Sequence, residues 1–217
     1  MFIGHYGVGL AAKRVAPRTQ LGVLIAAATF LDLLWPLFLL TGVERVRIDP
    51  GNTAVTPLDF AYYPFSHGLL PAFGWATAFA WLYQWRVRYL PGTIVVWLAV
   101  VSHWFLDALV HRPDLPLYPG SRTLVGLGLW NSWTGTLVVE GAVFLLGVAL
   151  YAREARPVDE IGIYGFWAFD VILVVLYSGS LLGPPPPSSN VIAVSDLGAC
   201  LLLALAWWFD RHRRSVR

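Results

Sequence analysis

The chain has 217 residues, of which 57% are hydrophobic and 13% are charged, whereas soluble domains carry about 25% charged residues. This composition predicts an integral membrane protein, and a formal net charge of +2 is too small to indicate a nucleic-acid partner. The single cysteine, Cys200, excludes an intramolecular disulfide and a cysteine-based zinc site.

Six segments are long and apolar enough to cross a bilayer, which requires about 20 helical residues. Short loops rich in proline or glycine separate them, and four consecutive prolines before the last segment cannot continue a helix. This arrangement predicts an all-α, polytopic transmembrane helix bundle that forms a single domain over residues 1–217. The predicted spans are approximately 20–42, 66–84, 93–111, 129–151, 161–183 and 190–209.

The basic residues all lie outside these spans and are distributed unevenly between the two sides. Eleven fall on the side of the N-terminus and four on the opposite side. Because basic loops stay in the cytoplasm, both termini are predicted to be cytoplasmic. The protein is therefore expected in the cytoplasmic membrane of a bacterium or archaeon, with the lipid bilayer as its partner.

Residues 2–12 are apolar but too short to span a membrane. Two interpretations stay open. A helix over about residues 2–13 can re-enter the bundle and lift His5 to mid-membrane, provided that protein encloses it; Gly4, Gly7 and Gly9 would then permit close packing. Alternatively, the segment lies flat at the interface as an anchor, and His5 is solvated.

Ionisable side chains gather in the first four predicted spans, where no lysine or arginine can neutralise them. His103, Asp107 and His111 are four residues apart, so a helix presents them on one face. Ionisable residues inside a membrane are costly and mark functional sites. A bound cation or shared protons explain this group better than structural hydrogen bonding does. At about 1.5 Å per residue, the side chains in the middle or outer half of the membrane are Asp32, His67, His103, Asp107 and Glu140.

Two further acids, Asp170 and Asp196, lie in the last two spans and are expected to be protonated or hydrogen-bonded within the bundle. Ser66 and Ser102 each directly precede a histidine. A hydrogen bond that orients the imidazole, or a helix cap at Ser66, is expected rather than a nucleophilic serine.

Imidazole and carboxylate ligands together suit a divalent metal, with zinc expected first and manganese or iron as alternatives. Four stretches occur in this order: GHYGVGLAA at 4–12, FLDLLWP at 30–36, YYPFSHGLL at 62–70 and SHWFLDALVHRPDLPLYPG at 102–120. In order and spacing, this set resembles the family of bacterial inner-membrane metal-dependent hydrolases over about the first 120 residues. The resemblance implies five metal-binding or catalytic residues: His5, Asp32, His67, His103 and Asp107.

The chain departs from the family pattern in two motifs. Leu34 and Trp35 stand where the family has a second aspartate and a histidine, and Tyr62 and Tyr63 stand where it has histidine and arginine. A carboxylate and a histidine are therefore missing, which leaves a one-metal site. The residues that can substitute are His111, Asp114 and Glu140.

The resemblance implies a metal-dependent hydrolase, and we expect it to act on an ester or phosphoester of a lipid or another membrane-associated substrate. Its site would open to the non-cytoplasmic side. Glu140 is the expected general base because it lies at a similar depth and has no role in the motifs. Two alternatives stay open: a proton- or cation-coupled transporter, and a non-catalytic membrane partner whose polar groups only fix helix packing. Bound metal separates the first hypothesis from the third, and ion counterflow separates it from the second.

Overall fold

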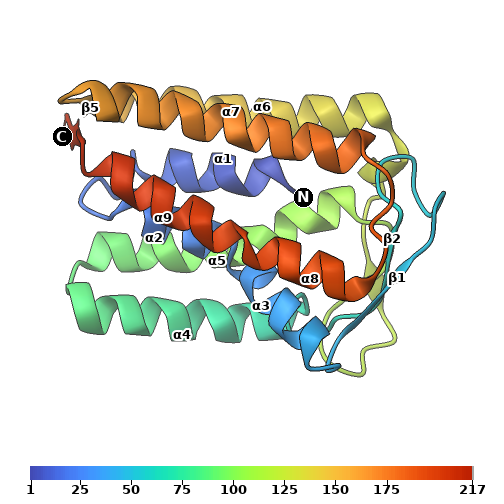
Figure 1. The fold of residues 1–217 in the computed structure, drawn as a ribbon. Coiled ribbons are helices and arrows are strands. Elements are labelled where there is room, and N and C mark those ends of the chain that lie inside the picture. Colours follow the sequence, from blue (N-terminus) through green and yellow to red (C-terminus); the bar gives the residue numbers. More distant parts are fainter. Residues whose placement is uncertain (217) are drawn as a thin grey trace.

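Long helices lie side by side along a common axis in the computed structural model, which describes residues 1–216 (Figure 1). Arg217, one of the predicted cytoplasmic basic residues, lies outside the described residues. The helices are α1 (Ile3–Ala12), α2 (Leu21–Ala28), α3 (Phe30–Leu40), α4 (Leu69–Val87), α5 (Leu90–Val110), α6 (Trp133–Glu154), α7 (Glu160–Leu182), α8 (Ser189–Leu197) and α9 (Ala199–Asp210), with a 3₁₀ turn η1 (Leu129–Asn131) before α6.

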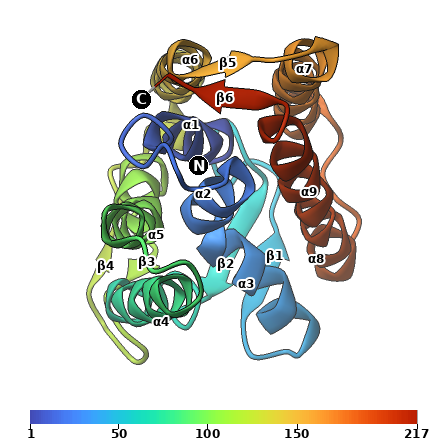
Figure 2. The ribbon, with the colours of Figure 1, turned by 90° about the vertical axis from the view of Figure 1, so that its left-hand side faces the viewer.

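Three antiparallel strand pairs cover the ends of the bundle (Figure 2). At the end that we call the hairpin end, β1 (Arg45–Ile48) pairs with β2 (Leu58–Tyr62). β3 (Leu115–Pro116) pairs with β4 (Leu124–Val125) in the segment between α5 and α6. At the opposite, C-terminal end, β5 (Ala155–Pro157) pairs with β6 (Arg213–Ser215).

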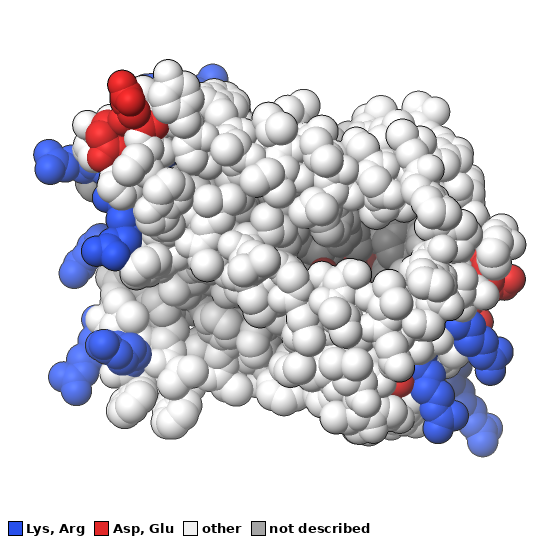
Figure 3. Space-filling model, in the orientation of Figure 1, with Lys and Arg blue, Asp and Glu red and all other residues white. Residues whose placement is uncertain are grey.

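The surface and the helix lengths are those of a membrane protein. Lysine and arginine gather at the two ends of the face that Figure 3 shows, and the middle is almost free of charge. Four helices are long and apolar enough to cross a membrane: α5, α6, α7 and the continuous pair α8–α9. The bent pair α2 and α3 makes a fifth if it counts as one span.

The prediction of six spans is therefore not confirmed. The predicted span 66–84 corresponds to α4, which is 19 residues long but is absent from the helices that are apolar enough. Its sequence explains the difference, because Tyr83, Gln84 and Arg86 lower the hydropathy of its last turns. The all-α class is confirmed.

Local signals set the helix ends. The side chains of Ser132, Asp159 and Ser188 accept hydrogen bonds from backbone amides three residues later and so begin α6, α7 and α8. At the C-terminal end, α4 stops at Arg88, whose φ is 54°. Pro91 then lies in the first turn of α5, where a missing amide hydrogen costs nothing.

The first predicted span is broken at Thr29, which leaves the helical conformation with φ −105° and ψ 12°. α2 and α3 meet there at 59°. The Thr29 hydroxyl donates to the Ile25 carbonyl, 2.9 Å away. Because the last carbonyls of a helix lack intrahelical partners, the break exposes the Ala28 carbonyl, and it places Asp32 in the first turn of α3.

The N-terminal helix α1 lies inside the bundle, packed against α2, α5 and α6 (Figure 2). Gly7 makes this approach possible, since a Cβ at that position would lie 2.6 Å from the Val143 carbonyl oxygen of α6. A Cβ at Gly147 of α6 would likewise collide with the Gly7 backbone. His5 is 1% exposed. The enclosed re-entrant helix is thus the interpretation that the structure shows, and the solvated anchor is wrong.

Two apolar clusters hold the helices together. One contains residues of α2, α3, α4, α5 and α8, among them Leu24, Ala76 and Val100. The other joins α1, α6, α7 and α9 around Phe144 and Phe169, among other buried rings. Truncating a buried ring of this size to alanine costs about 3–5 kcal/mol of folding free energy, so both clusters fix the helix positions on which the site depends.

Candidate metal centre

Two histidines and two aspartates from three parts of the chain converge near the middle of the bundle. Asp32 comes from α3, His67 from the loop before α4, and His103 with Asp107 from successive turns of α5. His103 Nε2 lies 3.1 Å from Asp107 Oδ2 and 3.5 Å from Asp32 Oδ1. His67 Nε2 lies 3.4 Å from Asp32 Oδ1 and 3.6 Å from Asp107 Oδ2. We call these four residues the metal centre.

These separations fit a metal ion. A tetrahedral zinc ion holds nitrogen and oxygen ligands at about 2.0–2.1 Å, which places the ligand atoms about 3.3–3.4 Å from one another. The four His–Asp separations, from 3.1 to 3.6 Å, fall around that value. The ligand atoms of Asp32, His67 and His103 all lie within 4.8 Å of one another. The donor set and its spacing therefore fit a metal ion.

The ring of His103 is fixed in the form that binds metal. Its Nδ1 lies 2.8 Å from the Ala28 carbonyl oxygen, so Nδ1 carries the proton and donates it. The Nε2 atom is buried and has no hydrogen-bond partner among residues 1–216. An imidazole whose first nitrogen donates to a carbonyl presents its second nitrogen as a ligand. The break after α2 is thus part of the centre, because it supplies that carbonyl.

His67 is oriented by a chain of two further side chains. Ser66 Oγ donates to Glu44 Oε2 at 2.5 Å and lies 2.8 Å from His67 Nδ1. Since the hydroxyl hydrogen goes to Glu44, the Nδ1–H of His67 donates to Ser66 and leaves Nε2 free. The predicted hydrogen bond between Ser66 and His67 is confirmed.

Glu44 is a residue that the sequence analysis missed. It is 1% exposed, and its Oε1 accepts the backbone amides of Phe65 and Ser66 at 2.7 and 2.8 Å. Glu44 lies in the loop after α3, outside the four motifs. Only the packing of that loop against the segment before α4 brings the carboxylate to Ser66, so no spacing signal was available.

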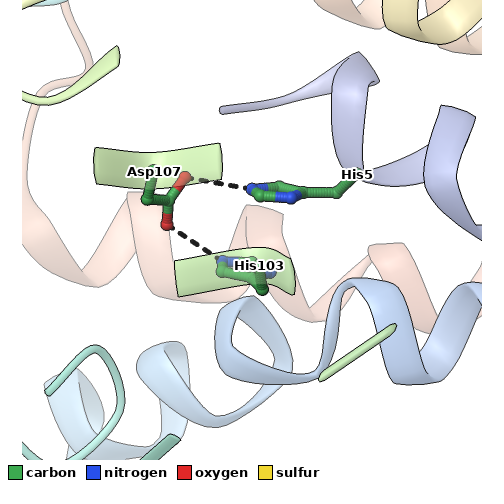
Figure 4. A group of neighbouring side chains, drawn as sticks. All are labelled: His5, His103 and Asp107. Atoms are coloured by element: carbon green, nitrogen blue, oxygen red, sulfur yellow. Dashed lines mark hydrogen bonds and ion pairs between the residues drawn. The ribbon is translucent and has the colours of Figure 1, made fainter. Parts of the chain in front are cut away.

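α1 brings a third histidine to the centre (Figure 4). His5 Nε2 lies 3.1 Å from Asp107 Oδ1, and its ring stacks on that of His103 with the centroids 3.7 Å apart. The Met1 amino nitrogen is 2.5 Å from the same Asp107 oxygen. His5, His103 and Asp107 form a second group that can hold a cation. The structure thus brings together all five residues that the resemblance implied, and the buried group can hold a metal ion.

One side of the centre is open. The side chain of Asp32 is 43% exposed, whereas those of His103 and Asp107 are 0% and 2% exposed. Structural zinc sites are closed by protein ligands, and catalytic sites keep a position for water or substrate. The exposed edge of Asp32 provides such a position.

Two of the three residues that were predicted as substitutes form a separate cluster, which we call the His111 cluster. His111 Nδ1 donates to Asp114 Oδ1 at 3.0 Å, and the Tyr63 hydroxyl donates to the same oxygen at 2.7 Å. Arg112 Nε donates to Asp114 Oδ2 at 3.3 Å and pairs with Asp59. Asp114 therefore already accepts three hydrogen bonds, one of them from an arginine that it shares with Asp59. Tyr63, Arg112 and Asp114 line a cleft of about 650 Å³ at the hairpin end.

The third substitute, Glu140 of α6, is buried, and its Oε2 accepts the backbone amide of Phe2 at 2.8 Å. This contact anchors the start of α1, and the role of Glu140 as general base stays a prediction. Asp170 of α7 is buried, and neither carboxylate oxygen has a hydrogen-bond partner among residues 1–216. It lies in the same helix as Phe169 of the second apolar cluster, away from the residues of the metal centre.

Comparisons with known proteins add no relative: no known protein family, no curated protein and no solved structure matches this chain. The site is consequently interpreted from its own geometry.

Proposed function

We propose that this protein is a membrane-embedded, metal-dependent hydrolase that acts on an ester or phosphoester of a membrane-associated substrate. The observation that carries the proposal is the group of Asp32, His67 and His103, whose ligand atoms lie within 4.8 Å of one another, with Asp107 Oδ2 3.1 Å from His103 Nε2 and one edge open at Asp32. The resemblance of the four motifs to bacterial inner-membrane hydrolases supports it. In the proposed orientation the hairpin end faces the non-cytoplasmic side.

The residues of the centre have complementary roles in this proposal. His67 and His103 offer neutral nitrogens, and Asp32 and Asp107 offer two negative charges, so that a bound dication is neutralised where the dielectric constant is low. A dication held there supplies Lewis-acid polarisation of the substrate oxygen and lowers the pKa of a water molecule. Zinc suits the mixed nitrogen and oxygen donors, and manganese or iron is the alternative.

Two residues are candidates for accepting the proton of the attacking water. His5 contacts Asp107 through Nε2, and its buried Nδ1 has no hydrogen-bond partner. Glu140 is bonded to the backbone of Phe2. A general base must reach the water directly or through one intermediate molecule, and His5, which touches a residue of the centre, is the better placed of the two.

Elemental analysis of the purified protein in detergent tests the metal directly. We expect about one zinc, manganese or iron ion per chain, because the ligand residues gather around one place. Asp32→Asn in the same preparation should lower the content. A wild-type protein that stays free of metal after dialysis against each ion would refute the proposal.

The hydrolytic step is tested with vesicles that contain ester and phosphoester lipids. Metal-dependent release of a cleaved headgroup or acyl chain is expected, and a chelator should abolish it. His5→Gln and Glu140→Gln then distinguish the two candidate bases, because only the true base lowers turnover while the metal stays bound. Ion counterflow in proteoliposomes without hydrolysis would favour the transporter instead.

A further inference from the structure

We propose that the substrate is a membrane lipid that reaches the metal centre sideways, from within the bilayer, through the gap between α7 and α8. This inference rests on the proposed function and adds the route and the class of substrate. The lipid keeps its acyl chains among the membrane-facing residues of the two helices while its polar headgroup enters as far as Asp32.

The gap follows from how the last helices pack. α9 packs against α2 and α7, whereas α8 packs against α3 and β1. The continuous rod of α8 and α9 therefore diverges from α7 toward the hairpin end (Figure 1). In the space-filling view a deep hollow opens at this place, between α7 above and α8 below (Figure 3).

The hollow leads to acidic groups. Acidic atoms are visible at its floor in Figure 3, and Asp32 is the carboxylate of the centre whose side chain is exposed. α8, which carries Asp196, packs against α3, which carries Asp32. Cys200 follows Asp196 by four residues in the continuous pair α8–α9, so the two lie on one helix face.

The rim of the hollow is uncharged. In Figure 3 uncharged side chains surround it, and α7 and the pair α8–α9 are long and apolar enough to cross a membrane. At this depth the surrounding medium is hydrocarbon, so an opening in the middle of the bundle faces acyl chains. A polar floor with an uncharged rim matches a lipid whose headgroup is inside and whose chains remain outside.

The route from the hairpin end is closed by side chains. Tyr63 and His111 are 1% and 2% exposed, and Tyr63 lies between the end cleft and the centre, with its ring centroid 5.4 Å from that of His67. A water-soluble substrate in the end cleft is therefore separated from the metal centre by a buried layer. This arrangement favours entry from the side over the predicted opening to the aqueous phase.

The test places manganese in the centre as a paramagnetic probe, in protein reconstituted into nanodiscs of phosphatidylglycerol. If a lipid headgroup reaches the metal, electron–nuclear double resonance detects phosphorus coupled to manganese. Cys200→Trp fills the proposed route and should abolish this coupling while the manganese content stays unchanged. Val194→Trp is the matched control, because residue 194 lies on the opposite face of α8 from Asp196, and should preserve the coupling.

A chemical version avoids any folding defect. N-phenylmaleimide added to the folded wild-type protein modifies Cys200, the single cysteine, which is exposed; the coupling should disappear, and it should persist in Cys200→Ser treated identically. Bound manganese without phosphorus coupling in the wild type would overturn the lipid route and leave the metal centre intact. Phosphorus coupling that persists both in Cys200→Trp and after modification of Cys200 by N-phenylmaleimide would also overturn the lipid route. A protein that binds no manganese, zinc or iron would instead refute the proposed function.

Discussion

The metal centre and the His111 cluster both use histidine and aspartate from residues 102–114, yet the partners of their aspartates differ. In the His111 cluster, Asp114 pairs with Arg112, which also pairs with Asp59, and receives hydrogen bonds from Tyr63 and His111. In the metal centre, Asp32 Oδ1 and Asp107 Oδ2 face imidazole nitrogens. The His111 cluster thus has an arginine as its cation, whereas the metal centre has the Met1 amino group at Asp107 Oδ1 and can hold a metal ion at its other ligand atoms.

The largest expected effect is loss of the metal. His103→Ala or Asp107→Ala should reduce the metal content to a small fraction of the wild-type value, because each removes a ligand of one shared ion. The double variant should lose no more than either single variant, since residues that act as a unit are not additive. His111→Ala is the matched control and should retain the metal. Elemental analysis and a chelator competition measure these contents; equal losses at residues 103 and 111 would erase the distinction between the clusters.

The sequence predicts those features of the two clusters that depend on residues close together in the chain. The i, i+4 spacing of His103 and Asp107 predicts their shared face, and Figure 4 shows it. His111 has the same spacing but lies beyond the last helical residue, Val110, with ψ at 145°. Pro113 is a signal for this end, since helices usually stop before a proline. The prediction that His111 shares a helix face with His103 and Asp107 is therefore wrong, because α5 ends before His111.

Other features depend on contacts that no local pattern encodes. An apolar run of 23 residues predicts one span over 20–42, but the turn at Thr29 divides it, and no proline or glycine marks the break. The resulting carbonyl of Ala28 orients His103. Glu44 reaches Ser66 only because two loops pack together. Local patterns therefore predict the residues that can hold a metal ion, and they do not predict Ala28 and Glu44, which orient them.

The next effect is a weaker metal site without loss of a ligand. Ser66→Ala removes the acceptor of His67 Nδ1, and Glu44→Gln removes the charge that orients Ser66. Each should weaken metal affinity by about 10–100-fold. Ser102→Ala is the matched control: Ser102 also precedes a histidine, but its hydroxyl donates to the Ala99 carbonyl at 2.7 Å. Its affinity should stay at the wild-type value; a loss as large as that of Ser66→Ala would contradict the assigned contacts.

A smaller expected effect is the dependence of metal affinity on pH, to which the metal centre should contribute and the His111 cluster should not. Metal binding requires unprotonated imidazole nitrogens at His67 and His103, so affinity should rise with pH as protons are released. Calorimetry in two buffers of different ionisation enthalpy counts these protons. His111→Ala should leave the count unchanged, because His111 binds no metal in this proposal. Binding of zinc or manganese with no proton release at any pH would show that the ligands are already charged and satisfied in another way.

The smallest effect tests whether the His111 cluster is only structural. Burial and the neighbouring Asp114 carboxylate raise the pKa of Tyr63 well above its ordinary value. Because the folded-state pKa is raised, the contribution of this hydroxyl to stability is complete below the unfolded value of about 10 and is lost only as the pH rises through the folded-state pKa. Tyr63→Phe keeps the ring and removes one donor from an acceptor that retains Arg112 and His111.

The expected cost of Tyr63→Phe is about 1 kcal/mol of unfolding free energy, the net value of one such hydrogen bond. Thermal unfolding in detergent at neutral pH measures it, with the metal content determined on the same sample. The content should be unchanged. If Tyr63→Phe released the metal as His103→Ala does, the two clusters would be one electrostatic unit, and the buried layer at Tyr63 would be part of the metal site.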